Sequence, residues 1–179
     1  TEIDKLIEHV ESHWGAIDVL VNNAGGPPPG EHTALEDEHW EQAFDLTLRS
    51  AVRVTNRVLP GMKKSGHGRI INLSSYSVKQ PMPRMMLSNS LRLAGLGWAK
   101  TLSNELAADN ILVNTICTGW TKTQRVDQLL EARAKAEGVP VEDIANAITA
   151  MIPLKRMAQP EEIAAVALFL ASPAASYIT

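Results

Sequence analysis

Three short apolar runs divide the chain, and each has the length of a β-strand. They cover residues 17–22, 70–73 and 111–116 and consist mainly of Ile, Leu and Val. Apolar runs of this length that are bounded by Gly or polar residues are typical of strands buried on both faces. The pattern therefore predicts a sheet whose strands are covered by other elements on each side.

Between and around these runs, apolar residues recur at helical spacing. The helices predicted from this spacing cover residues 2–13, 36–64, 87–107, 124–136, 141–151 and a last segment that begins at Pro160. The second helix is either continuous or interrupted near Leu59 and Pro60, because proline disfavours a helix interior. Alternating strands and helices indicate the α/β class, with a parallel sheet, helices on both faces and right-handed crossovers. We expect the strand order 17–22, 69–74, 111–116.

The first apolar run ends in two amides and two small residues, Asn22, Asn23, Ala24 and Gly25. Such residues at the carboxyl end of a parallel strand lie where an open α/β sheet has its ligand crevice. Ala24 and Gly25 would let another molecule approach the backbone, and the two amides can join neighbouring strands. A strand end closed by an Asn-Gly-type turn fits the same segment, so both interpretations stay open at this point.

Composition and charge narrow the class of protein. Apolar residues make up 45% of the chain and charged residues 21%, which is ordinary for one globular domain. The net charge of −3 argues against nucleic acid or an anionic membrane as a partner. No apolar run approaches membrane-spanning length, and the first residues do not form a signal peptide. A single cysteine, Cys117, fits a reducing compartment, so we expect a cytoplasmic protein.

The five histidines do not predict a metal centre. His9 and His13 are one helical turn apart, but polar residues surround them and no zinc-protease pattern is present. We interpret them as part of a solvated helix face and expect no bound metal.

Four segments together resemble the short-chain dehydrogenase/reductase family. They are Asn22–Gly25 (NNAG), Gly68–Ser75 (GRIINLSS), Asn110–Asn114 (NILVN) and Gln159–Ala164 (QPEEIA). Each is weak evidence alone, but their order and spacing are specific, and the branch of 3-oxoacyl carrier-protein reductases is similar as well. The resemblance implies a Rossmann-like doubly wound sheet, NAD or NADP as cofactor, and a small-molecule carbonyl or alcohol as substrate.

The resemblance also implies that the chain is the central part of a longer protein. The Gly-x-Gly-x-x-Gly turn that holds a pyrophosphate at a helix N-terminus does not occur in these 179 residues. We therefore expect residues 1–179 to form a single, incomplete dinucleotide-binding domain. The residue that distinguishes NAD from NADP is expected upstream.

The resemblance assigns catalytic roles to four positions, of which one keeps the family's residue. Ser75 matches the Ser that hydrogen bonds the substrate oxygen. The Tyr that acts as the acid and the Lys that holds the nicotinamide ribose fall on Ser88 and Arg92, and the Asn that supports a proton-relay water falls on Thr47. A Ser hydroxyl is far less acidic than a phenol with a pKa of about 10. Arg92 stays charged and can still donate to a ribose hydroxyl.

Several of these side chains also have a purely structural interpretation. Ser75 could form a turn after its strand, Ser88 could be the N-cap of the following helix, and Thr123 could be the N-cap of the helix near Gln124. Tyr76 is a phenol next to Ser75, on a segment expected to be a loop.

A further set of positions corresponds to cofactor contacts in the family. Residues 118–123 (TGWTKT) resemble its Pro-Gly-x-x-x-Thr, with Thr118 in place of the Pro. The cofactor contacts implied by the resemblance are Asn23, Ala24, Gly25, Arg92, Gly119, Thr121 and Thr123.

Two functions are compatible with this sequence. One is an NAD(P)-dependent oxidoreductase that interconverts a carbonyl and a secondary alcohol. The alternative is a catalytically weak cofactor- or ligand-binding paralogue that acts through association, which the residues at positions 47, 88 and 92 favour.

The resemblance further implies a homodimer or homotetramer that pairs through the helix 87–107. On this helix Leu91, Trp98, Leu102 and Leu106 share one stripe, which is expected to face the sheet. Leu93 and Leu96 lie on roughly the opposite side and are expected to face a second subunit.

Overall fold

The computed structural model describes residues 1–179, which form two compact units. The first unit contains residues 1–117 and 167–179, and the second contains residues 118–166. None of the helices is both long and apolar enough to cross a membrane. That the whole chain is one incomplete domain stays a prediction.

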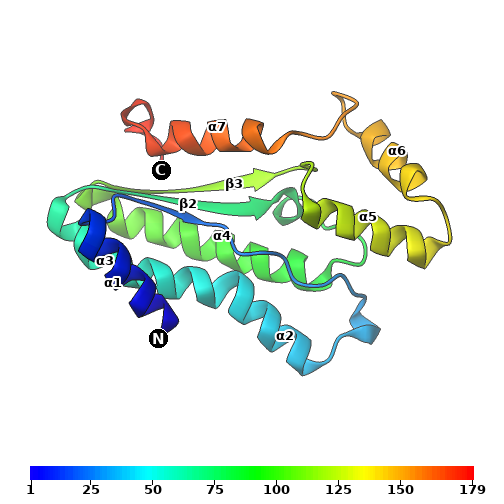
Figure 1. Ribbon diagram of the computed structural model, residues 1–179, viewed down its shortest axis with the longest axis horizontal. Coiled ribbons are helices and arrows are strands. Elements are labelled where there is room, and N and C mark those ends of the chain that lie inside the picture. Colours follow the sequence, from blue (N-terminus) through cyan, green and yellow to red (C-terminus); the bar gives the residue numbers. More distant parts are fainter. The chain divides into compact units, whose positions relative to one another are not determined.

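A three-stranded parallel sheet is the centre of the first unit. Its strands β1 (Val19–Asn22), β2 (Gly68–Ser75) and β3 (Ile111–Thr118) lie in the order β1-β2-β3 and point the same way (Figure 1). Strands β1 and β2 pair in parallel, with Asn22 opposite Asn72 at the carboxyl end. The predicted class and strand order are therefore confirmed.

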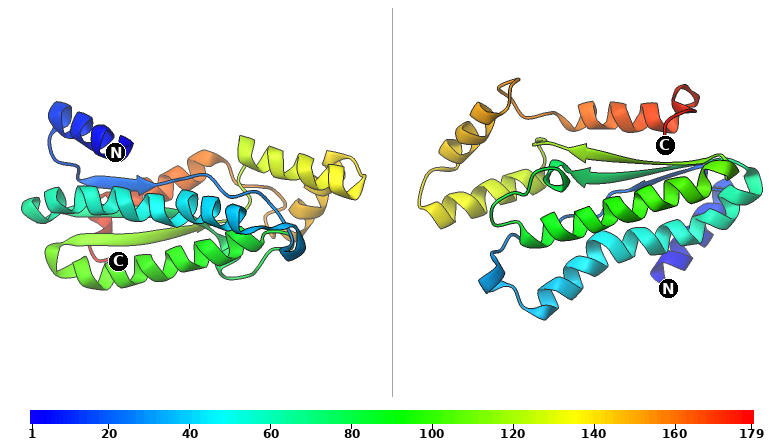
Figure 2. Two further views of the ribbon diagram at one scale, coloured as in Figure 1. Left: turned by 90° about the horizontal axis from the view of Figure 1, so that it is seen from below. Right: turned by 180° about the vertical axis from the view of Figure 1, so that it is seen from behind.

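Helices cover both faces of this sheet. The helices of the first unit are α1 (Glu2–Trp14), α2 (Asp37–Phe44), α3 (Ser50–Ser65), α4 (Met86–Leu106) and the end of α7 (Pro160–Ala171). Helices α3 and α4 lie along one face, and residues 167–171 of α7 lie along the other (Figure 2). The crossover helices and the sheet together form a layered α/β unit.

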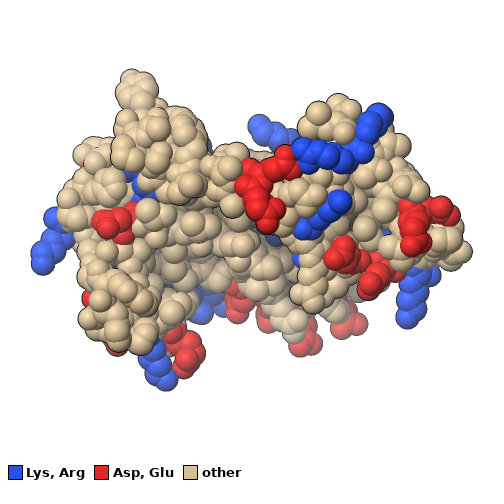
Figure 3. Space-filling view, turned by 45° about the horizontal axis from the view of Figure 1, so that its top comes forward, with Lys and Arg blue, Asp and Glu red and all other residues tan.

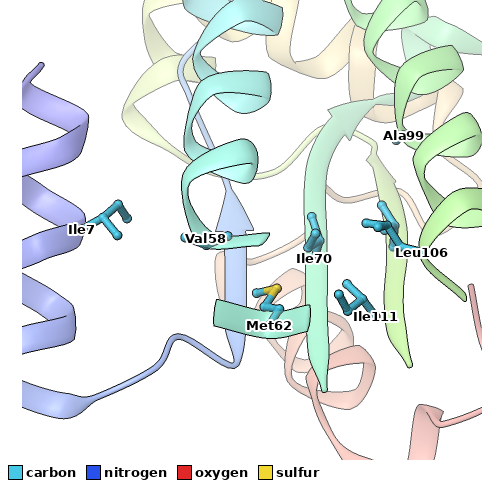
Figure 4. Close-up of a cluster of buried hydrophobic side chains, with 8 residues drawn as sticks. Ile7, Val58, Met62, Ile70, Ala99, Leu106 and Ile111 are labelled. Carbon is cyan, nitrogen blue, oxygen red and sulfur yellow. The ribbon is translucent and has the colours of Figure 1, made fainter. Parts of the chain in front are cut away.

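Alternation along β2 places its apolar side chains in two different cores. Ile70 is fully buried in a cluster with residues of α3 and α4, among them Met62 and Leu106 (Figure 4). Ile71 points to the other face, where it packs with Leu170 and Ala175. Because Ile70 and Ile71 point to opposite faces and are both buried, the sequence of this strand shows a continuous apolar run and no alternation.

The predicted helix 36–64 is irregular at one place, which is not the proline. A π-helical turn at Asp45–Arg49 separates α2 from α3. Pro60 lies inside α3, which continues to Ser65, so of the two alternatives the helix is continuous at this proline. Proline removes one backbone donor, and the fully buried side chains of Val58 and Met62 on either side hold this last part of the helix in the core.

The second unit is built around a helical hairpin. Helices α5 (Gln124–Glu137) and α6 (Val141–Met151) pack through Leu130, Ile144 and Ile148. Gly138, with a φ of 68°, ends α5 in the left-handed conformation that glycine adopts without strain.

Charged side chains are dispersed over the face of the molecule drawn in Figure 3. Acidic and basic residues stand there in small groups separated by uncharged surface, and they form no extended basic surface. This distribution agrees with the low net charge of −3.

Candidate active site

A cavity of about 400 Å³ lies in the first unit, against the carboxyl ends of β1 and β2. Its lining comes from α1, β1, the segment after β1, the π-helical turn, α3, β2, β3 and α4. The predicted site residues in this lining are Asn23, Ala24, Gly25, Thr47 and Arg92. Residues from distant parts of the sequence therefore meet where open α/β sheets bind their ligands.

Two features of this cavity fit a ligand that carries hydrogen-bond acceptors, such as a nicotinamide dinucleotide. A side chain at Gly25 would meet no other atom within 4 Å, so the backbone here is open to close approach. The amide nitrogen of Asn72 is buried without a hydrogen-bond partner, and Asn72 lines the cavity. A buried donor of this kind is costly unless it is satisfied, which a ligand with acceptor atoms would do.

The carboxyl ends of β1 and β2 are joined by an amide network. Asn22 donates through Nδ2 to Oδ1 of Asn72 at 2.9 Å and to the hydroxyl of Thr55 at 3.3 Å. The expected role of an amide in joining neighbouring strands is thus confirmed for Asn22. Sequence reasoning missed Asn72 and Thr55; the available signal was a polar residue within the apolar run of β2.

Ser88 and Arg92 form one hydrogen-bonded unit on α4. Nε of Arg92 donates to the Ser88 hydroxyl at 3.2 Å, and its terminal nitrogens donate to the carbonyls of Leu73 at 3.3 Å and Gly25 at 3.5 Å. These carbonyls belong to β2 and to the segment after β1. The guanidinium therefore ties α4 to the ends of two strands.

The N-cap interpretation of Ser88 is wrong. Helix α4 begins at Met86 and its N-cap is Met85, so Ser88 lies within the first turn. The helix starts early because the N–H of Met86 donates to the carbonyl of Gly30. Ser88 is 5% exposed and is not among the residues that line the cavity, whereas Arg92 is.

Ser75 ends β2 and also shapes the turn that follows. Its hydroxyl accepts a hydrogen bond from the N–H of Ser77 at 3.1 Å and caps the 3₁₀ turn Tyr76–Val78. The turn-forming interpretation of Ser75 is confirmed, and its catalytic role stays a prediction. Tyr76 opens this turn and is half-buried.

Thr47 lies in the π-helical turn and lines the cavity. Its hydroxyl donates to the carbonyl of Ala43 at 2.6 Å. Single π turns inside helices are frequent at functional sites because they change the direction of backbone groups. The π-helical turn therefore indicates a functional site at Thr47, and this indication does not depend on the Thr47 side chain.

The remaining predicted cofactor contacts belong to the second unit. Thr123 caps α5, since its hydroxyl accepts from the N–H of Val126 at 3.4 Å. The hydroxyl of Thr121 donates to the carbonyl of Gly119 at 3.3 Å. The N-cap interpretation of Thr123 is confirmed, and cofactor contacts by these three residues stay a prediction.

A parallel sheet with crossover helices and a ligand crevice at its carboxyl edge defines a nucleotide-binding α/β protein. The chain belongs to the short-chain dehydrogenase/reductase family, because the family model described as enoyl-(acyl carrier protein) reductase matches residues 1–179.

Relatives over almost the whole chain agree with this assignment. The chain is 35% identical to the 3-oxoacyl-acyl-carrier-protein reductase of Thermotoga maritima, covering 99% of this chain and 68% of the relative. It is 34% identical to the D-beta-hydroxybutyrate dehydrogenase of Cupriavidus necator, covering 99% and 69%. Among solved structures, the F189W actinorhodin polyketide ketoreductase with NADPH is 35% identical to this chain and superposes with a TM-score of 0.95. The match covers 99% of this chain and 69% of the ketoreductase.

The family defines the general chemistry of the protein. It is an NAD(P)-dependent oxidoreductase with a Rossmann-like fold, which interconverts a carbonyl and a secondary alcohol. The residues of the cavity fit such a cofactor through the open backbone at Gly25 and the unsatisfied amide of Asn72.

Proposed function

We propose that the full-length protein reduces the 3-oxo group of an acyl thioester, or oxidises the corresponding 3-hydroxy compound. The observation that carries this proposal is the identity of 34–35%, over 99% of the chain, to a 3-oxoacyl reductase and a β-hydroxybutyrate dehydrogenase. The chain spans 68–69% of the length of these relatives, so the activity is proposed for the longer protein.

In this proposal Arg92 and Thr47, which line the cavity, act on the substrate oxygen together with Ser75 and Ser88, which lie outside its lining. The hydroxyl of Ser75 donates a hydrogen bond to that oxygen, and the charge of Arg92 favours the negative charge that develops on it. Ser88 or a water relays the proton, and Thr47 holds that water. The bound dinucleotide supplies or accepts the hydride.

The same proposal assigns the cofactor to two groups of residues. Asn23, Ala24, Gly25 and Arg92 would hold its ribose and nicotinamide side in the first unit. Gly119, Thr121 and Thr123 would contact the carboxamide. Gly25 supports this assignment, because its backbone is open to close approach.

We also propose a cytoplasmic homodimer or homotetramer. The single cysteine supports a reducing compartment. Exposed Leu93 on α4 supports a contact between subunits, since 53% of this large apolar side chain is accessible.

The experiment follows NADPH and NADH absorbance with acetoacetyl-CoA as the substrate. We expect both dinucleotide binding and slow reduction, and Ser75→Ala should lower kcat by about 10²-fold while leaving the dinucleotide Kd unchanged. Arg92→Met should weaken dinucleotide binding. If the protein binds a dinucleotide but reduces neither acetoacetyl-CoA nor simple ketones, the binding-paralogue alternative is correct.

A further inference from the structure

The segment 81–86, between the strand that ends in Ser75 and helix α4, is held at Met82 by the side chain of Asn89. Asn89 accepts a hydrogen bond from the N–H of Met82 at 3.2 Å and donates to the carbonyl of the same residue at 2.9 Å. One amide therefore satisfies both backbone polar groups of Met82. Such a two-bond contact fixes position and orientation together.

A second contact joins this segment to the loop after β1. Gly30 and Met85 form an isolated parallel bridge, in which the N–H of Gly30 donates to the carbonyl of Arg84 at 2.7 Å. A side chain at Gly30 would come within 2.8 Å of Cδ2 of Leu35, so Gly30 packs closely against Leu35 within the loop after β1. The loops that follow β1 and β2 are thus connected.

The backbone conformation of the segment needs these contacts. Arg84 has a φ of 60°, which is disfavoured for a residue with a Cβ atom. Unfavourable backbone conformations persist where the surroundings determine them, and they concentrate at functional sites. The hydrogen bonds of Asn89 to Met82 and the bridge between Gly30 and Met85 fix the backbone on either side of Arg84.

The segment lies beside the residues already assigned to the active site. Asn89 directly follows Ser88 and precedes Arg92 by three positions. Arg92 donates to Gly25, which lies in the same loop as Gly30. Asn89 therefore joins the segment to the part of α4 that carries Ser88 and Arg92.

The side chains of the segment are suited to an apolar part of a substrate. It carries Met82 and Met85, which are half-buried, and Met86, which is 37% exposed. Methionine is flexible and polarizable and adapts to apolar ligands of different shape. This composition favours a flexible acyl chain over a rigid polar group.

We propose that Asn89 is a positioning residue, which holds the methionine-bearing segment 81–86 as the wall that receives the apolar chain of the substrate. This inference rests on the proposed function for its substrate. Asn89 would not touch the reacting atoms, and its effect would pass through the backbone of Met82.

The test compares Asn89→Ala with Asn104→Ala in the full-length protein. Asn104 is the matched control because it is exposed on the same helix α4 and has the same side chain. Hydrogen exchange measured by mass spectrometry should rise in peptides covering residues 79–86 for Asn89→Ala only. The KM for acetoacetyl-CoA should rise at least about tenfold, with kcat and the Kd of NADPH within about twofold of the unmodified protein.

Two more variants separate hydrogen bonding from packing. Asn89→Asp has the same shape but cannot donate to the Met82 carbonyl when ionised, so it should behave like Asn89→Ala. Gly30→Ala places a methyl group against Leu35 and leaves both hydrogen bonds of Asn89 in place, so it should not reproduce the increase in exchange of Asn89→Ala.

Three results would overturn the proposal. Asn89→Ala could match Asn104→Ala in both exchange and KM, Asn89→Asp could behave like the unmodified protein, or KM and the NADPH Kd could rise together. Failure of the unmodified protein to bind NADPH and reduce acetoacetyl-CoA would instead reject the proposed function and the substrate assignment of this wall. The exchange data would still decide whether Asn89 holds the segment.

Discussion

Arg92 shows how one residue changes the properties of a catalytic position. The lysine that the family has at this position carries an ammonium, which is a compact charge on a flexible stem. The guanidinium of an arginine instead has five N–H donors in a fixed plane. Arg92 uses this plane to reach Ser88, Leu73 and Gly25. The residue therefore stabilises the ends of two strands in addition to placing a permanent charge at the cavity.

This geometry makes a prediction for the double variant Ser88→Tyr plus Arg92→Lys. It should raise kcat for acetoacetyl-CoA by about 10²-fold, because it supplies a phenol tuned by an ammonium as general acid. Steady-state kinetics of the full-length protein provide the measurement. Arg92→Lys alone is the control and should lower thermal stability, since the bonds to the Leu73 and Gly25 carbonyls are lost. If the unmodified protein is already fast and Ser88→Ala has no effect, position 88 is not the acid.

Glu162 is a second residue whose contacts have a measurable consequence. It accepts two hydrogen bonds from Arg156, at 2.6 and 2.7 Å, and one from the N–H of Gln159 at 2.8 Å. These bonds, that from Arg156 above all, lower the pKa of the Glu162 carboxyl to about 2 from its usual 4.5. The ionised form is therefore the one that the folded state favours.

We predict that Glu162 adds a pH-dependent contribution to stability. Because the pKa is lower in the folded state, the contribution is fully present above pH 4.5 and is lost as the pH falls towards 2. Urea midpoints measured between pH 6 and 2 should differ between the unmodified protein and Glu162→Gln at the upper end and converge at the lower. Glu161→Gln, next to it on α7, is the matched control, because it removes the same charge and leaves the bonds of Glu162 to Arg156 and Gln159 in place. A constant difference for Glu162→Gln would contradict the assignment.

The roles of single residues could be predicted only where they are local. Thr123 as the cap of α5 and Ser75 as a turn former depend on neighbours within three positions. The amides after the first run predicted that Asn22 joins neighbouring strands, but its partner Asn72 lies 50 positions away and was not identified from the pattern. The catalytic assignments came from a family resemblance and not from a local pattern.

At the scale of elements, helix α4 shows which part of an amphipathic pattern is reliable. Trp98, Leu102 and Leu106 pack in the core as predicted. Leu93 is 53% exposed on the other side, in agreement with its predicted position. Leu96 was expected beside it, but it is half-buried and lines the cavity, so this expectation is wrong. The error arises because α2 and the π-helical turn pack against α4 in addition to the sheet.

The exposed position of Leu93 gives a test of the proposed oligomer. Leu93→Glu in the full-length protein should dissociate it without unfolding, because a carboxylate would be buried in an apolar contact between subunits. Light scattering measures the mass and circular dichroism the fold. Leu154→Glu, at a side chain that is 76% exposed in the second unit, is the control and should keep the oligomer. An unchanged mass for Leu93→Glu would exclude this face of α4 as the interface.

Helix 36–64 illustrates the limit of periodicity at this scale. A π turn adds one residue to a turn of helix without a polar or proline signal, so residues 45–49 could not be recognised in the pattern. Pro60 gave a strong signal and caused no break. The existence and order of the helices and strands could be predicted from local patterns. Irregular turns within a helix depend instead on the residues that pack against that helix.

At the scale of the whole molecule, the sheet has two edges of different character. Strand β3 has the C-terminal residues beside it, since the N–H of Val113 donates to the hydroxyl of Thr179 and the amide of Asn114 donates to the carbonyl of Ile178. Strand β1 pairs on one side only, with β2. Val19 and Val21 on this strand are 40% and 46% exposed. An apolar strand with a free edge is a template for pairing with other chains.

We therefore predict that residues 1–179, expressed alone, form soluble aggregates or inclusion bodies, and that Val21→Lys increases the monomer fraction. Lysine at an edge strand opposes edge-to-edge pairing, because a second chain would have to bury its charge. Size-exclusion chromatography with light scattering gives the monomer fraction. Leu6→Lys is the matched control, since it adds the same charge at a side chain that is 57% exposed on α1 and leaves the strand edge unaltered. An equal gain from both variants would assign the effect to net charge, and a monodisperse unmodified chain with a sharp thermal transition would show that the free edge of β1 does not drive association.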